Sequence, residues 1–205
     1  KIITITIGGD TYNITYDSEG KVSQAAITPD NLIVQFQYSG NTVILNYTQN
    51  GTFQRKTIVT KNEQGFAANV RAEMNQAGTK WSNEAMQYEG TKLVKVVNTF
   101  SGNSPTLTAE YEWKNDNMVR TVFGNIIIDH EYDLTRPSQI GEINYLKKLL
   151  LGAKIHNNKN LLKSTVNDGD ITNFIYIFDT SGRITTVSEV TSNSTLVYAH
   201  EYLCN

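Results

Sequence analysis

Apolar and polar residues alternate along most of this chain, and short polar turns interrupt the alternation at regular intervals. One phrase recurs, in which an aromatic residue precedes a polar turn centred on Gly or Asn and a new alternating run follows, as in residues 16–22, 88–94 and 178–184. The ring packs across to the neighbouring strand, and Gly accepts the positive φ that a tight reversal needs. The phrase is therefore typical of a β-hairpin.

Alternation of this kind predicts strands along nearly the whole chain. In one clear case Val34, Phe36 and Tyr38 share one face of a strand. Residues 65–85 are richer in Ala and could form a strand pair or a short helix; the turn-like residues 75–79 favour strands. The predicted strands are residues 3–7, 12–16, 22–27, 32–38, 42–47, 52–60, 67–74, 81–88, 93–100, 106–113, 118–123, 126–132, 162–166, 171–178, 184–191 and 196–203.

Residues 136–163 interrupt the strand pattern. The apolar run 143–151 ends at Gly152 and predicts one short helix of about ten residues within the insertion 139–152, followed by a loop. No Pro/Ser-rich linker or block of charge divides the chain elsewhere. Residues 1–205 are therefore expected to form a single domain.

Consecutive strands joined by short turns are antiparallel neighbours, so the predicted fold is all-β. We expect an antiparallel up-and-down meander of about twelve to fourteen strands. Twist curls a sheet of this size into an open or a closed barrel. The helical insertion is the natural plug or cap of that barrel.

Composition narrows the classes of function. A net charge of −2 at pH 7 gives no positive field of the kind that nucleic acid requires, so no nucleic-acid partner is expected. The single cysteine, Cys204, excludes an intrachain disulfide and a multi-cysteine metal cage. No apolar run reaches the roughly 18 residues of a membrane-spanning helix. The sequence begins at Lys1 inside a predicted strand, which suggests that an upstream signal segment, with a lipid anchor as one option, was removed.

No reactive constellation stands out. Histidines 130, 156 and 200 lack a ligand spacing, so we expect no metal site and no cofactor. Asp168 and Asp170 could donate oxygen ligands to calcium, but the longer acidic loop ending in Glu that an EF-hand needs is absent. We therefore predict that they belong to a turn between strands. Carboxylates that could in principle serve a hydrolase are interpreted as solvated strand positions: Glu110, Glu112, Asp129 and Glu131. We assign no catalytic residue.

Two groups of side chains suggest binding. Exposed aromatic residues on a concave sheet can stack against sugar rings or peptides, although cross-strand packing explains most of them. The aromatic group is Trp81, Tyr88, Tyr111 and Trp113. The second group, Lys147, Lys148 and Lys154, could contact anionic lipid or a partner; the alternative is a capping helix with its leucines facing the interior and its lysines solvated, which we favour.

The order of these features resembles one family. The Tyr-x-x-x-Gly-x-Leu/Val phrase, the break at Pro137, the segment 159–161 and the ending 176–184 followed by Tyr198 and Tyr202 resemble the DUF4595 family. The resemblance covers essentially the whole chain. It implies a porin-like meander fold and a secreted, often lipid-anchored protein of Bacteroides-type bacteria, located in the periplasm or at the cell surface. It implies no activity and no catalytic residues.

Three hypotheses on function follow. The first is a non-catalytic protein of the cell envelope that binds a glycan, a peptide or an envelope partner, or has a structural role. The second is a periplasmic carrier whose curled sheet encloses an apolar ligand; a hydrolase is least supported. A membrane-embedded porin is disfavoured because polar residues occupy predicted outward positions, namely Gln35, Gln37, Lys92, Lys95 and Arg120.

Overall fold

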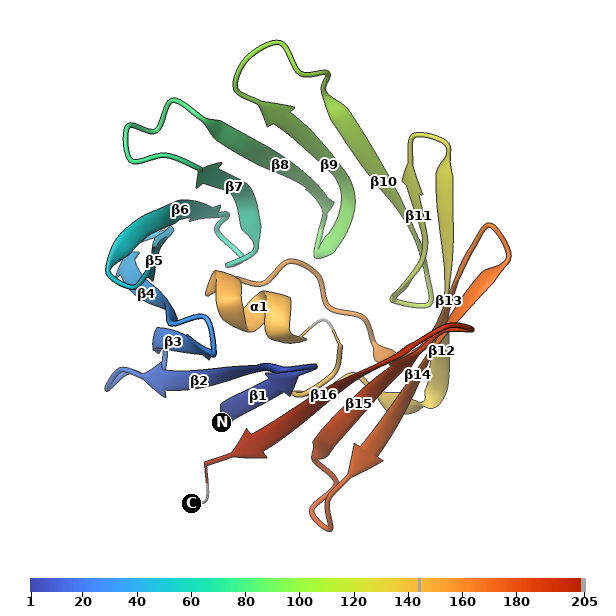
Figure 1. Cartoon of the computed structure of the whole chain (residues 1–205). Helices are drawn as coiled ribbons and strands as arrows, with labels where there is room; N and C mark the ends of the chain where they lie inside the picture. Colours follow the sequence, from blue (N-terminus) through green and yellow to red (C-terminus); the bar gives the residue numbers. More distant parts are fainter. Residues whose placement is uncertain (144, 204–205) are drawn as a thin grey trace.

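The computed structural model describes residues 1–143 and 145–203, without the side chains of residues 146 and 147. Sixteen antiparallel strands close into a barrel in which each strand pairs with the next and the last strand pairs with the first (Figure 1). The predicted all-β meander is confirmed in its closed form. The number of strands exceeds the expected twelve to fourteen because every alternating segment forms its own strand, including the two that flank the turn at 74–80.

The strands and the helix follow the sequence order closely. They are β1 (Ile2–Ile7), β2 (Asp10–Tyr16), β3 (Val22–Thr28), β4 (Leu32–Ser39), β5 (Thr42–Gln49), β6 (Thr52–Lys61), β7 (Ala67–Glu73), β8 (Trp81–Glu89), β9 (Lys92–Phe100), β10 (Leu107–Lys114), β11 (Asn117–Phe123), β12 (Ile126–Pro137), α1 (Tyr145–Leu151), β13 (Asn160–Asn167), β14 (Asp170–Phe178), β15 (Ile184–Val190) and β16 (Thr195–Tyr202). The helix is shorter than predicted, with seven residues.

The recurring phrase forms the turns that lead from an even-numbered strand to the next odd-numbered strand. In the turn after β2, Asp17 Oδ1 accepts a hydrogen bond from the Lys21 amide and Gly20 has φ of 81°. The turn after β14 repeats this arrangement with Asp179, Arg183 and Gly182. The positive φ explains why Gly ends both turns.

In seven even-numbered strands a Tyr or Trp forms a hydrogen bond; Tyr16 and Tyr88 are the aromatic residues of the phrase itself, whereas Tyr176 lies two residues before Phe178. Near the end of an even strand, the polar atom of this Tyr or Trp donates to a backbone carbonyl near the start of the preceding odd strand, at 2.5 to 3.0 Å. The donor and acceptor pairs are Tyr16 to Ile2, Tyr38 to Val22, Tyr88 to Ala67, Trp113 to Leu93, Tyr132 to Met118, Tyr176 to Leu162 and Tyr202 to Ile184. All seven acceptor residues are buried. These hydrogen bonds thus link the open ends of seven odd-to-even hairpins.

We call one end of the barrel the narrow end, because residues 138–159, the connection from β12 to β13, lie across it, and we call the opposite end the wide end. The narrow end holds the even-to-odd turns and the seven aromatic donors, and the wide end holds the loops from each odd strand to the next even strand. In Figure 1 the loops β7–β8, β9–β10 and β11–β12 lie at the outer edge of the view, whereas the turns β8–β9 and β10–β11 lie nearer α1.

Residues 138–159, which connect β12 to β13 and include α1, form a plug. Several of its contacts are with turns or strand ends at the narrow end. Phe66, in the turn after β6, forms a β-bridge with Lys154, and the Tyr88 hydroxyl oxygen also lies 2.9 Å from the carbonyl oxygen of Ile155. The Lys159 amide donates to the carbonyl of Asp116 at 3.0 Å. The plug therefore covers the narrow end of the barrel, which is where β12 ends and β13 begins.

Three apolar clusters fix the plug to the wall. The leucines 149–151 of α1 pack on the cluster inside β1–β7, which includes the fully buried Ile5 and Leu45. Ile155 packs on a cluster in β9 and β10, and Ile143 packs on a third cluster in β13 and β15. The hydrophobic core therefore lies between the plug and the surrounding strands. Burial of this kind provides roughly 25 cal/mol per Å² of apolar surface.

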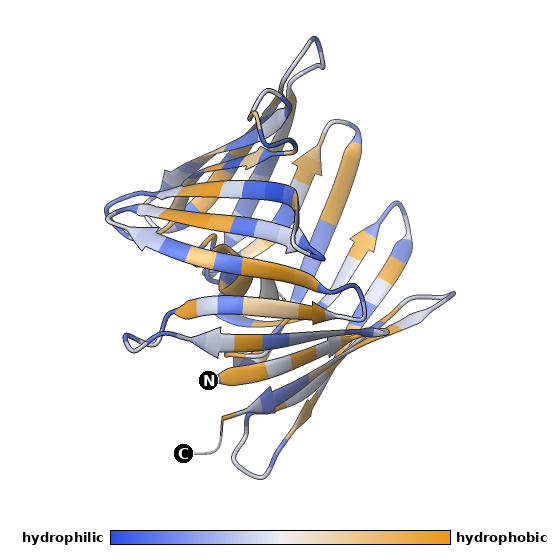
Figure 2. Cartoon of the chain, turned by 60° about the vertical axis from the view of Figure 1, so that its left-hand side comes forward, coloured by the Kyte–Doolittle hydropathy of each residue, from blue (hydrophilic) through white to orange (hydrophobic). Residues whose placement is uncertain are grey.

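The outer wall of the barrel is polar over much of its circumference. Hydrophilic and hydrophobic residues alternate along the strands (Figure 2). Ion pairs link neighbouring strands at outward positions: Lys56–Glu73, Lys95–Glu110, Arg120–Asp129 and Lys163–Glu131. Within the described ranges, no helix combines the length and hydropathy needed to cross a bilayer.

The aromatic hydrogen bonds predict a measurable contribution to stability. Tyr132→Phe removes the donor to the buried Met118 carbonyl at 2.7 Å, and should lower the free energy of unfolding in urea by about 1 kcal/mol. Tyr47→Phe is the matched control, because the described residues offer its hydroxyl no hydrogen bond and its ring stacks on Arg55. Equal losses in the two variants would contradict a role for the hydroxyl.

Candidate functional site

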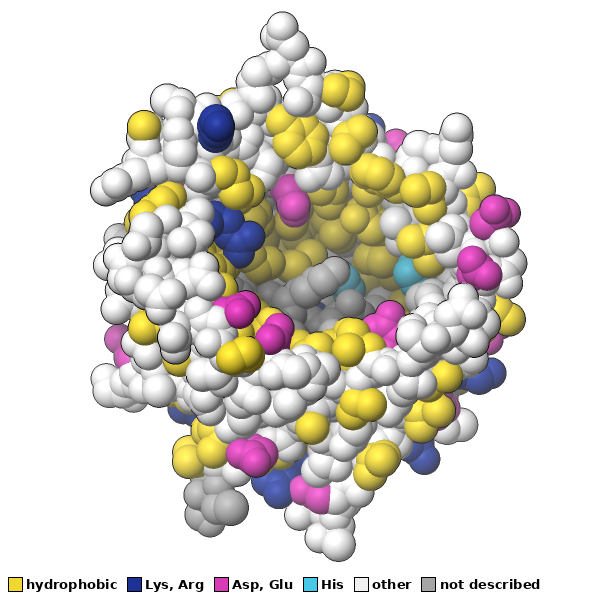
Figure 3. Space-filling view, viewed as in Figure 1, with side chains coloured by type: hydrophobic (Ala, Val, Ile, Leu, Met, Phe, Trp, Pro, Cys, Tyr) yellow, Lys and Arg dark blue, Asp and Glu magenta, His cyan; other side chains and the backbone are white. Residues whose placement is uncertain are grey.

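A hollow opens inside the barrel, and hydrophobic side chains cover much of its wall (Figure 3). The strand registers place one group of apolar side chains inward on β9–β12, in the part nearer the wide end. This apolar wall consists of Phe100, Leu107, Tyr111, Phe123, Ile126 and Ile128. Leu107 and Ile126 keep 39% and 47% of their surface exposed although they face inward. The plug therefore leaves the wide end of the lumen uncovered.

Three of the four predicted aromatic binding residues face the lumen. Tyr88 and Trp113 lie deep, where Tyr88 contacts the plug and the Trp113 ring meets His156 edge-on with ring centroids 6.4 Å apart. Tyr111 lies higher on the wall, and burial, with a smaller effect of Glu84, raises the pKa of its hydroxyl. Their role in ligand binding stays a prediction.

Trp81 is separated from the other three aromatic residues. It pairs with Glu73 on the outer wall and lies under the Arg71 guanidinium, whose carbon is 4.7 Å from the ring centroid. The reason is the strict alternation of a strand, because Trp81 and Tyr88 differ by an odd number of positions. The four side chains therefore do not form one face.

The three predicted lysines also have different environments. Lys148 donates to Glu142 at 3.1 Å, and its side chain is only 16% exposed. The expectation of solvated lysines is therefore wrong for Lys148, because a buried carboxylate needs this cation. Lys154 is exposed, with its ammonium 5.9 Å from the Phe66 ring centroid. The side chain of Lys147 lies outside the described residues.

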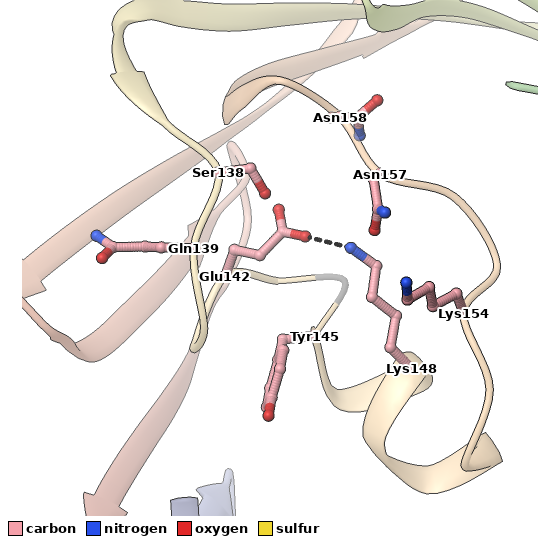
Figure 4. A pocket seen from close by; sticks show the side chains of 8 residues that line it. All are labelled: Ser138, Gln139, Glu142, Tyr145, Lys148, Lys154, Asn157 and Asn158. Atoms are coloured by element: carbon pink, nitrogen blue, oxygen red, sulfur yellow. Dashed lines mark hydrogen bonds and ion pairs between the residues drawn. The ribbon is translucent and has the colours of Figure 1, made fainter. Parts of the chain in front are cut away.

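The plug has two arms, residues 138–143 before α1 and residues 152–159 after it. A cavity of about 360 Å³ lies between these two arms (Figure 4). We call it the plug pocket; its lining is Ser138, Gln139, Glu142, Tyr145, Lys148, Lys154, Asn157 and Asn158. Glu142 is 3% exposed, and its Oε2 accepts no hydrogen bond from the described residues, although the Ser138 hydroxyl approaches the carboxylate. Burial raises the pKa of Glu142, opposed mainly by Lys148.

Two histidines face the lumen as structural groups. His130 Nε2 lies 2.9 Å from the Thr121 hydroxyl, and His200 Nε2 lies 2.9 Å from the carbonyl of Gly141 in the plug. Burial lowers the pKa of both imidazoles. The described residues contain no group of three His, Cys, Asp or Glu side chains that could hold a metal ion.

The candidate carboxylates do not converge on these histidines. Glu110, Asp129 and Glu131 point outward and join the ion pairs of the outer wall. Asp168, at φ of 49°, is part of the turn between β13 and β14. The candidate carboxylates and the histidines therefore do not form an acid–base pair. The features that remain as candidate sites are the apolar wall of the lumen and the polar plug pocket.

The sequence reasoning missed the most deeply buried charge of the insertion. Glu142 is the only acid between Arg136 and Lys163, a stretch that contains five lysines. A lone acid in a basic insertion with apolar neighbours was the available signal, since such a carboxylate can neutralise a lysine drawn into the interior.

Comparison with known proteins adds information on the fold. No protein-family model matches the sequence, and no curated protein matches it either. A porin-like protein from Bacteroides vulgatus superposes with a TM-score of 0.68 at 12% identity, covering 98% of both chains. A porin-like protein from Bacteroides uniformis gives 0.63 at 13% identity, covering 98% of this chain and 96% of that one. The chain shares their fold. At this level of identity, the similarity shows nothing further.

The histidine environments predict how stability depends on pH. Because the folded pKa of His130 and His200 lies below the ordinary 6.5, the unfolded state binds more protons as the pH falls through that value. The free energy of unfolding should therefore decrease between about pH 7 and about pH 5.5. Urea titrations should show a smaller decrease for His200→Gln, whose amide can still donate to Gly141. An unchanged slope in this variant would rule out His200 as a contributor.

Proposed function

We propose that this protein is a non-catalytic binding protein of the cell envelope that holds an apolar ligand in the wide end of its barrel. The main support for this proposal is the apolar wall. Its Leu107 and Ile126 face inward and remain exposed, although the plug fills the narrow end of the barrel. Apolar side chains that line a concave hollow are typical of ligand sites, in which burial of the ligand supplies most of the affinity.

The closed narrow end favours a binding cavity that is open at one end over a channel that passes through the barrel. The plug is anchored in three apolar clusters, its Ile155 carbonyl lies within hydrogen-bond distance of Tyr88 in β8, and its Lys159 amide donates to Asp116 in the turn after β10. Opening a passage would break these contacts together. A ligand that enters through the wide end therefore meets the plug as a floor.

An envelope location is supported by two observations. The structural neighbours named above are porin-like proteins of Bacteroides species, and the outer wall carries interstrand ion pairs at positions where a lipid-facing barrel has an apolar band. We therefore infer a barrel that faces water outside the cytoplasm. Membership of the DUF4595 family is consistent with this and stays a prediction.

A binding role is favoured over hydrolysis by the side chains of the lumen. His130 and His200 are hydrogen-bonded to Thr121 and to the plug, and the carboxylates considered for catalysis face outward. Acid and base groups of a hydrolase have to face one substrate. The apolar wall instead offers surface without reactive groups.

Binding of N-phenyl-1-naphthylamine, an uncharged fluorophore that brightens in apolar surroundings, tests the proposal. The wild type should bind it saturably, and Leu107→Gln should weaken binding about ten-fold by placing an amide in the apolar wall. Ile127→Gln is the matched control, because Ile127 is 48% exposed and faces outward one residue from Ile126.

The result expected is a loss of affinity in Leu107→Gln alone, with thermal melting showing that both variants are folded. Absence of saturable binding to the wild type would refute an apolar lumen site. Equal weakening by the inner and outer substitutions would place the fluorophore elsewhere and would also refute it.

A further inference from the structure

The plug pocket is chemically unlike the apolar wall. Its lining contains one carboxylate, two ammonium groups, three amides, one hydroxyl and one tyrosine ring, gathered from both arms of the plug (Figure 4). We propose that the plug pocket is a second ligand site, and that it takes an acidic sugar, a hydroxyl-bearing carboxylate with a pyranose ring. This site goes beyond the apolar binding proposed for the lumen and does not depend on it.

Glu142 is the first argument. Lys148 occupies Oε1 of this carboxylate, whereas Oε2 is buried in the pocket lining and receives no hydrogen bond from the described residues. A buried carboxylate oxygen left without a donor is unfavourable by roughly 1–3 kcal/mol or more. A ligand hydroxyl is the natural donor, because hydroxyl groups donate to carboxylates at short distance without adding a charge.

The amide side chains are the second argument. Asn157 supplies both a donor and an acceptor, and Asn158 supplies a donor, which matches the hydroxyl groups of a sugar ring, whereas the amide of Gln139 points away from the Glu142 carboxylate (Figure 4). Asn158 is fixed in place, because its Oδ1 accepts a hydrogen bond of 3.0 Å from the Met118 amide. The ring of Tyr145 provides an apolar surface of the kind on which sugar C–H groups pack.

The charge of the pocket selects an acidic ligand. Lys148 and Glu142 balance one another at 3.1 Å. Lys154 adds a second ammonium group for which no described acidic side chain lies within ion-pair distance, and its described contact is with the ring of Phe66. A ligand carboxylate would pair with Lys154, while an amine would meet an unbalanced positive charge.

The size of the pocket agrees with this ligand class. Its volume of about 360 Å³ lies near the lower limit of small-molecule sites, which span roughly 300–1,000 Å³. This is room for one or two sugar rings, and too little for a long glycan chain to be enclosed. A terminal acidic sugar or a free one therefore fits.

The experiment uses isothermal titration calorimetry of the whole chain with D-glucuronate, D-glucose and D-glucosamine. We expect saturable binding of glucuronate, with glucose binding at least about ten-fold more weakly and glucosamine more weakly still. Lys154→Gln should abolish the preference for glucuronate over glucose. Lys159→Gln is the matched control, since this exposed lysine lies on the same arm of the plug but does not line the pocket.

Three outcomes would overturn the proposal. They are no saturable binding of glucuronate to the wild type, an unchanged preference in Lys154→Gln, and glucosamine as the tightest ligand. Glu142→Gln gives a second test, because it leaves an acceptor but converts the other position to an amide donor; it should weaken binding of both glucuronate and glucose. Thermal melting confirms that each variant is folded, and naphthylamine binding reports on the lumen separately.

Discussion

The closure of sixteen strands into one barrel sets the constraint on which the rest of the structure depends. About eight strands give an interior that wall side chains can fill, whereas sixteen leave a space too wide for them. Buried residues such as Ile5, Leu45 and Ile184 therefore need partners from another part of the chain. The plug provides these partners, through the leucines of α1 and through Ile143 and Ile155.

The plug fills the lumen unevenly, and this separates two environments. At the narrow end, aromatic donors satisfy buried carbonyls, and glycines let the chain approach closely. A Cβ at Gly141 would lie 2.8 Å from the Tyr202 hydroxyl oxygen, and one at Gly152 would lie 3.1 Å from that of Tyr38. At the wide end, Leu107 and Ile126 face the lumen without a cover. Within the plug, Glu142 and Lys148 form a buried ion pair, whereas the contacts between the plug and the wall are mainly apolar.

Local patterns were sufficient to predict the strands but not their consequences in space. Alternation and the aromatic-turn-Gly phrase predicted the segments that become β1–β16, because hairpin chemistry is local. Whether the sheet closes depends on the pairing of β1 with β16, which no local signal specifies. The phrase also did not reveal that the Tyr88 hydroxyl lies within hydrogen-bond distance of two carbonyls, those of Ala67 and Ile155. Likewise, the burial of Lys148 depends on Glu142, and only the folded plug brings the two together.

The position of the plug in the sequence has a consequence for how the chain folds. Strands β1–β7 are complete by residue 73, yet the leucines that cover their inner face lie at 149–151. An amino-terminal fragment would therefore expose a concave apolar sheet, and an edge at β1 that only β16 can pair. Contacts this distant in sequence slow folding. During synthesis, the first half of the chain is thus prone to aggregate until the last third has left the ribosome. We expect such an intermediate to be a substrate for a chaperone that binds exposed apolar surface.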